Sequence, residues 1–203
     1  MRSPNLSRLR AFVLGFADLV SRATDEAAIL GEGAVLLGEL VARDDWLPDA
    51  YARAATDGGY GQHLLYLDPT ARFSVVSFVW GPGQGTPVHD HTVWGLVGAL
   101  RGAEISQGFA RAAGGLVPDG PPRRLQTGQV EAVSPTIGDI HQVRNALVHA
   151  PSISIHVYGG DIGRIPRHSF GADGAVKSFV SGYSSQTPPN LWTAPAPPVR
   201  QDA

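Results

Sequence analysis

The chain has 203 residues, of which 43% are hydrophobic, and it carries 16 Lys and Arg against 18 Asp and Glu. This length suits one domain with attached helices, and a net charge of -2 without a long block of one sign argues against nucleic-acid or membrane partners. The absence of cysteine excludes disulfides, thiolate metal sites and a cysteine nucleophile. No leader peptide or membrane-spanning run is evident, so we expect a cytoplasmic protein.

Apolar residues at helical spacing open the chain. Across residues 6–20 they recur every three or four positions, which predicts an amphipathic helix. A second helix is expected after Thr24 as its N-cap, and a short third helix over residues 48–55. We assign residues 1–58 to helices that pack on the rest of the domain and have no chemical role.

From residue 62 the pattern changes to short β-prone runs separated by Gly, Pro or Asp. Seven or more such runs without helices between them predict an all-β, jelly-roll barrel over residues 59–186. Residues 187–203 are Pro-rich and are expected to form an extended tail. The runs are QHLLYLD, FSVVSFVW, TVWGLVGAL, AEISQGFA, QVEAV, IHQVRNAL and SISIHVYG.

Histidines suggest a metal site. His89 and His91 are two residues apart, so on a strand both side chains would point to one face. His141 opens another expected strand. Three neutral imidazoles would leave the charge of a divalent ion undiminished and so favour an anionic ligand such as a thiolate. Imidazole suits Fe, Zn, Cu and Ni alike, so these ligands alone do not name the metal.

The spacing around these histidines resembles the paired motifs of cupins. The first motif has Gly95 where cupins usually have Glu, and the second has one extra residue between Pro and Gly. The matching positions of the first motif are Gly83, His89, His91, Gly95 and Gly102, and those of the second are Gly128, Pro135, Gly138, His141 and Asn145.

A further polar row lies in the run SISIHVYG. Ser154, His156 and Tyr158 alternate along it, so on a strand they share one face. Alternation alone leaves two arrangements open. Either this row faces the barrel interior, or it faces water and the intervening apolar residues point inward.

Together these features resemble the thiol dioxygenases of the cysteine dioxygenase type, over roughly residues 60–170. The resemblance implies mononuclear non-haem Fe(II) on His89, His91 and His141, with a small thiol and O2 as reactants and a sulfinate as product. It also implies that the row faces inward. Tyr158 would then lie near the oxygen and substrate site, held there by His156 and Ser154.

Two departures from mammalian-type cysteine dioxygenases affect the expected substrate. Those enzymes link a Cys to the active-site Tyr, which a chain without cysteine cannot do. They also bind the substrate carboxylate with an Arg where this chain has Gln62. In bacterial enzymes resembling 3-mercaptopropionate dioxygenase, Gln replaces that Arg, and an Arg at the position of Arg167 takes the carboxylate.

We therefore expect Arg167 and Gln62 to bind the substrate, with 3-mercaptopropionate favoured. Cysteine and mercaptosuccinate remain alternative substrates. A cupin with another metal, or one that binds without catalysis, remains an alternative class. The sequence does not indicate the oligomeric state.

Overall fold

The computed structural model describes residues 5–55, 59–185 and 187–192. Its helical elements are α1 (Ser7–Arg22), α2 (Glu26–Val41) and the 3-10 turn η1 (Asp49–Tyr51). The strands are β1 (Gly61–Leu67), β2 (Ser74–Trp80), β3 (Val88–His89), β4 (Gly95–Arg101), β5 (Ala103–Ala112), β6 (Gly115–Pro118), β7 (Arg123–Gln126), β8 (Val130–Val133), β9 (His141–Asn145), β10 (Ser152–Tyr158), β11 (Arg167–Phe170) and β12 (Val176–Phe179).

The strands form two facing sheets. The first sheet has the order β1-β2-β10-β4-β8, and the second has the order β12-β11-β3-β9-β5-β6, with β7 also paired to β5. From β2 to β5, and again from β8 to β11, successive strands alternate between the sheets, and the strand pairs are antiparallel. This alternation confirms the predicted jelly-roll barrel of the cupin kind.

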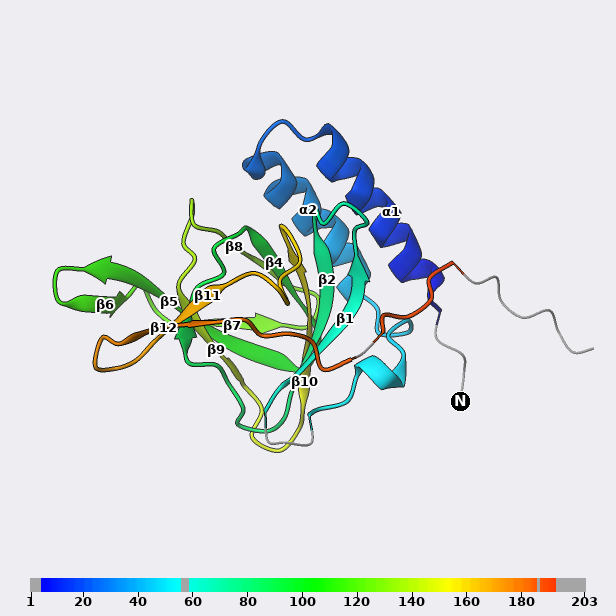
Figure 1. The fold of residues 1–203 in the computed structure, drawn as a ribbon. Helices are drawn as coiled ribbons and strands as arrows, with labels where there is room; N and C mark the ends of the chain where they lie inside the picture. Colours follow the sequence, from blue (N-terminus) through cyan, green and yellow to red (C-terminus); the bar gives the residue numbers. More distant parts are fainter. Residues whose placement is uncertain (1–4, 56–58, 186, 193–203) are drawn as a thin grey trace, which may run out of the picture.

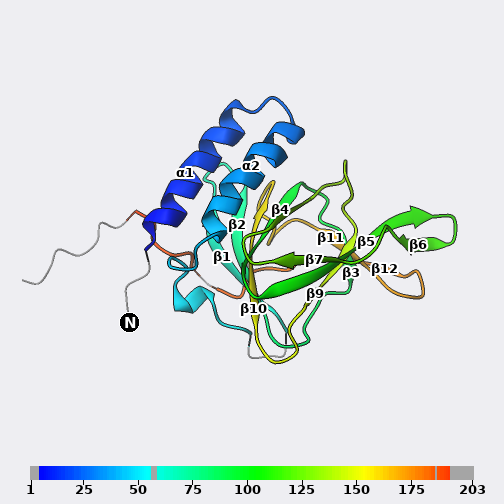
Figure 2. The same ribbon diagram turned by 180° about the vertical axis from the view of Figure 1, so that it is seen from behind.

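The helical segment covers the outer face of the first sheet. Helices α1 and α2 lie side by side, and α2 contacts β4 and β8 (Figures 1 and 2). A Cβ on Gly98 of β4 would lie 2.9 Å from Leu37 Cγ of α2, so this glycine permits the close approach of helix and strand. The predicted N-terminal helical segment is therefore confirmed.

Because the helices cover its outer face, the first sheet is buried on both faces. Every residue of β2 and of β10 is buried. On the outer face, Ile153, Ile155 and Val157 of β10 join the core formed with α1 and α2. On the inner face, Tyr158 packs inside the barrel with residues such as Phe78 and Trp80. The apolar residues of β10 therefore pack under the helices, and its polar row lies in the barrel interior.

Several sequence-based element boundaries were wrong. The N-cap of α2 is Asp25, not Thr24, and its carboxylate accepts a hydrogen bond from the backbone N–H of Ala28 at 2.8 Å. The expected third helix is only the turn η1. Strands β3, β6, β7, β11 and β12 were not predicted; β5 and β6 form a hairpin that projects from the barrel (Figure 1).

The expected domain boundaries stay predictions, because residues 56–58 and 186 lie outside the described part of the chain. Most of the expected tail, residues 193–203, also lies outside it. Within residues 187–192, the carbonyl of Thr187 accepts a hydrogen bond from Tyr51, and Leu191 is buried in the core beneath α1 and α2.

Candidate metal centre

Strands β3 and β9 bring the candidate ligands together. His89 and His141 are direct cross-strand partners in this antiparallel pair, and His91 follows two residues after His89. One ring nitrogen from each histidine lies within 4.8 Å of the others, and all three side chains are buried. This cluster can hold a metal ion.

His91 is not on a strand, contrary to the expectation that it shares the strand of His89. Strand β3 ends at His89, and Thr92 has a φ of 62°. The carboxylate of Asp139 holds this turn by accepting hydrogen bonds from the backbone N–H groups of His91 and Thr92, each at 3.0 Å. A turn fixed by a carboxylate, and not strand alternation, therefore aims His91 at its two partners.

The Nδ1 atom of each histidine is engaged away from the cluster. His89 Nδ1 donates to the carbonyl of Pro87 at 3.1 Å, and His91 Nδ1 donates to Asp139 at 3.0 Å. His141 Nδ1 lies 3.3 Å from Ser106 Oγ. Such hydrogen bonds orient metal-bound imidazoles and leave the Nε2 atoms for the metal. His91 Nε2 is buried and has no hydrogen-bond partner within the described residues.

Burial keeps the His89 and His141 imidazoles in the neutral form that binds a metal. Desolvation, with a smaller contribution from the charge of His91, lowers the pKa of His89 to about 3. Burial also lowers the pKa of His141 well below its ordinary value. Neutral imidazole is the form that binds metals. The chemistry of the donors, their proximity and the orphaned His91 nitrogen all fit a divalent transition metal.

The polar row of β10 lies beside this cluster. Ser154 Oγ and His156 Nε2 are 2.8 Å apart, and His156 Nδ1 and the Tyr158 hydroxyl are 2.7 Å apart. The Tyr158 ring stacks on His91 with a centroid separation of 5.4 Å. Burial raises the pKa of Tyr158 and lowers that of His156 well below its ordinary value, so both groups are neutral.

Arg167 brings a positive charge to the same cavity. Its side chain is only 3% exposed, lies over the ring of Phe179 at 4.7 Å, and donates from Nη2 to Ser181 Oγ at 2.6 Å. Among the described residues no carboxylate forms an ion pair with Arg167, and its Nε makes no hydrogen bond. Because a buried charge without a counterion is costly, this guanidinium is suited to an anionic ligand.

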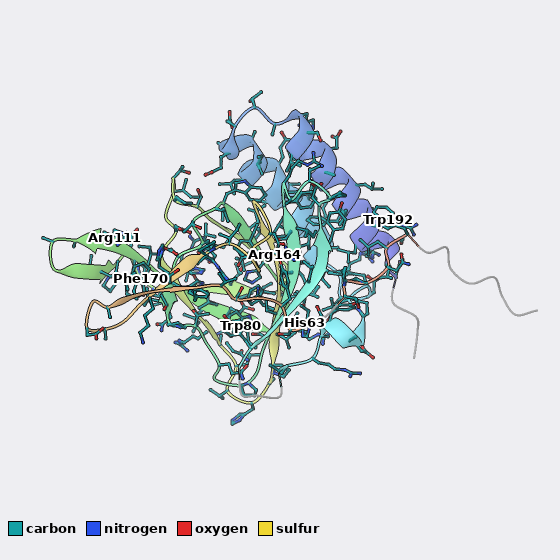
Figure 3. All side chains as sticks on the ribbon, in the orientation of Figure 1. His63, Trp80, Arg111, Arg164, Phe170 and Trp192 are labelled. Carbon is teal, nitrogen blue, oxygen red and sulfur yellow. The ribbon has the colours of Figure 1, made fainter. Side chains whose placement is uncertain are left out.

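Gln62 is buried and shares a hydrogen-bond partner, Ser181, with Arg167. Its amide nitrogen donates to Ser181 Oγ and to the carbonyl of Gly182, each at 3.0 Å. Ser181 therefore joins Gln62 to Arg167. The side chain of Arg164, labelled in Figure 3, is 87% exposed and pairs with Asp161, so it points away from this cavity.

An aromatic wall completes a small cavity over the cluster. The Tyr60 and Trp80 rings lie 4.7 Å apart, and the Phe78 ring lies 4.2 Å from that of His156. Within the described part of the chain, no Asp or Glu lines this cavity. Its lining residues are Tyr60, Phe78, Trp80, Thr86, His89, His91, His141, Val143, His156, Tyr158 and Arg167.

The structure thus gathers the predicted histidines, the Ser154–His156–Tyr158 row and Arg167, while Gln62 contacts Arg167 only through Ser181. Sequence reasoning missed Asp139, Ser106 and Ser181. The position of Asp139, two residues before His141 and next to Gly138, was a usable signal. Ser106 and Ser181 offered none, because isolated serines are common in any sequence.

Comparison with known proteins shows a similarity to a curated enzyme. The chain is 27% identical over 161 residues to cysteine dioxygenase type 1 from Danio rerio, covering 72% of this chain and 74% of that protein. No family model matches.

The solved structures that match do so weakly. A double-stranded β-helix protein from Klebsiella pneumoniae has a TM-score of 0.43 and 21% identity, covering 55% of this chain and 80% of its own. A cupin 2 conserved barrel protein from Salinispora arenicola has a TM-score of 0.40 and 24% identity, covering 57% and 87%. The fold assignment therefore rests on the strand order of this chain and not on these matches. In the described ranges, no helix is both long and apolar enough to cross a bilayer.

Proposed function

We propose that this protein is an Fe(II)- and O2-dependent thiol dioxygenase that converts a small thiol carboxylic acid to its sulfinate. The observation that carries the proposal is a buried Arg167 without a carboxylate partner, in one cavity with three converging histidines. The similarity to cysteine dioxygenase type 1 supports the choice of reaction and of iron.

His89, His91 and His141 would hold the iron through their Nε2 atoms. Bound there, ferrous iron would supply the redox chemistry by which dioxygen oxidises a thiol sulfur. In the balanced reaction both atoms of O2 end on sulfur and the thiol proton is released. The remaining residues bind the substrate, orient it and exclude water.

Arg167 would bind the substrate carboxylate. A guanidinium can hold a carboxylate through two charge-assisted hydrogen bonds, which fixes its orientation as well as its position. Tyr158, held by His156 at 2.7 Å, would direct its hydroxyl group to the substrate. Tyr60, Phe78 and Trp80 would keep bulk water out, which strengthens each of these polar contacts.

We propose 3-mercaptopropionate as the preferred substrate. Cysteine carries an amino group as well as its thiol and carboxylate, and among the described residues no Asp or Glu lines the cavity to receive an ammonium group. A mercapto acid without an amino group needs no acidic residue in the cavity. The Gln at position 62, as in the bacterial enzymes resembling 3-mercaptopropionate dioxygenase, supports the same choice.

The experiment is dioxygen uptake by iron-loaded protein with 3-mercaptopropionate, cysteine, mercaptosuccinate and a thiol that lacks a carboxylate. We expect the highest kcat/KM with 3-mercaptopropionate. A higher kcat/KM with cysteine would reassign the substrate but keep the reaction. No uptake with any of the thiols would refute the reaction itself.

A further inference from the structure

Glu104 is a buried carboxyl group that the proposed chemistry does not use. It lies on β5, only 2% exposed, and no Lys, Arg or His among the described residues forms an ion pair with it. Ser106, two positions along the same strand, reaches His141. Glu104 therefore points to the same side, into the barrel interior.

The polar groups that act on this carboxyl are Ser154 and Trp80. Burial raises the pKa of Glu104 to about 8, although Ser154 and Trp80 oppose the rise, and the charge of Glu131 on β8 adds to it. The arginines of the adjoining strands, Arg124 and Arg144, are both paired with Ile105 and so lie on the opposite face. At neutral pH the group is a protonated acid.

Ser154 joins this acid to the hydrogen-bonded row of β10. The indole N–H of Trp80 donates to Ser154 Oγ at 3.2 Å, and the row continues through His156 to Tyr158. A neutral imidazole donates from one nitrogen and accepts at the other. If His156 donates to one neighbour, it must therefore accept from the other. The hydrogen bonds along the row then all run from Ser154 towards Tyr158, or all run from Tyr158 towards Ser154.

We propose that protonated Glu104 donates to Ser154 and thereby makes Tyr158 a hydrogen-bond donor toward the cavity. Ser154 then donates to His156 Nε2, and His156 Nδ1 donates to the Tyr158 oxygen, which leaves the phenol hydrogen for the substrate. Glu104 is thus a positioning residue that acts through the row.

Loss of the Glu104 proton reverses the row. The Ser154 hydroxyl turns to the carboxylate, His156 donates from Nε2 to Ser154, and the Tyr158 hydroxyl donates to His156 Nδ1. Ser154, His156 and Tyr158 hold the same number of protons in both orientations, so only Glu104 gains or loses one. The role toward substrate rests on the proposed function, whereas the reversal itself needs no metal.

The test is nitrogen NMR of the His156 ring in the metal-free protein, from below to above the pKa of Glu104. We expect the wild type to change from the Nδ1–H to the Nε2–H tautomer. The Glu104→Gln variant keeps an N–H donor that cannot titrate, so it should retain the Nδ1–H tautomer throughout. Glu32→Gln is the matched control, since Glu32 is a surface carboxylate paired with Arg22, and it should behave as the wild type.

A wild-type tautomer that does not change with pH, or a Glu104→Gln variant that changes as the wild type does, would overturn the proposal. If that variant does not fold, infrared spectra of the wild type decide. The carbonyl stretch of a protonated buried acid should disappear as pH rises, over the same range as the tautomer change. The absence of this stretch at low pH would contradict the proposal. Failure of thiol oxidation would leave these results unaffected, so the two proposals fail separately.

Discussion

Gly95 and Tyr158 are direct partners across the β4–β10 pair, and a Cβ on Gly95 would lie 2.9 Å from the Tyr158 ring. Cupins usually place a glutamate at this position of the first motif. Here a side chain would occupy the volume that the tyrosine ring fills. A glutamate side chain at position 95 and the Tyr158 ring therefore cannot both fit in this arrangement.

Gly95→Ala should displace Tyr158 and slow turnover roughly tenfold or more, because small misplacements of reacting groups are costly in rate. Metal content should not change, since the three histidines come from other segments. The measurement is kcat together with bound iron. Gly31→Ala, at a helix position with nothing within 4 Å, is the control. Wild-type kcat in Gly95→Ala would contradict the packing argument.

Asp139→Ala should weaken metal binding by roughly 10- to 100-fold, which is typical of losing a hydrogen bond to a metal-bound histidine. The carboxylate holds both the His91 ring and the turn that carries it. Competition titration with a metal chelator measures the change. Asp173→Ala is the matched control. The Asp173 carboxylate accepts a hydrogen bond from the backbone N–H of Ala175 in another loop, so its loss should leave the metal affinity unchanged.

Arg167→Leu should lower kcat/KM for mercapto acids by roughly 10²- to 10³-fold, since removing one partner of a buried charge pair costs about 2–5 kcal/mol. A thiol without a carboxylate should lose far less. Arg164→Leu, at the exposed ion pair, is the matched control. Equal losses for both kinds of substrate in Arg167→Leu would remove its proposed role.

Ser181→Ala should raise KM for the thiol acid several-fold with little change in bound metal. Its hydroxyl oxygen accepts hydrogen bonds from both Arg167 and Gln62, so its loss leaves the guanidinium less firmly placed. Steady-state kinetics measure the effect against Ser178→Ala on exposed β12. An unchanged KM would show that Arg167 is held by other contacts.

The raised pKa of Glu104 predicts a pH-dependent stability. Between its ordinary value of 4.5 and about 8, the folded protein keeps a proton that the unfolded chain has lost. The free energy of unfolding should therefore fall as pH rises through this window, relative to Glu104→Gln, by up to about 1.4 kcal/mol per pH unit. Urea denaturation of both metal-free proteins measures the difference. Parallel pH curves would contradict the shift.

Much of this site follows from local sequence patterns. Spacing identified the histidines, and alternation identified Ser154, His156 and Tyr158 as one row. Alternation could not decide which face of β10 is interior, because that depends on α1 and α2 covering the other face. Only the three-dimensional packing shows which face points into the barrel.

The missed residues have a related physical reason. Glu104 and Ser106 alternate with apolar neighbours, a pattern that usually marks a solvent-facing strand surface. In this barrel the polar face is the interior one, since it holds the site. Asp139 and His91 are 48 residues apart, and Ser181 and Gln62 are 119 apart, so no local pattern connects them.

The most direct test of the proposed chemistry is the ratio of dioxygen consumed to sulfinate formed by iron-loaded protein with 3-mercaptopropionate. One sulfinate for each dioxygen, with no hydrogen peroxide, and loss of this activity in His141→Ala, is the predicted result. Uptake that yields peroxide and disulfide instead of sulfinate, or full activity without His141, would contradict it.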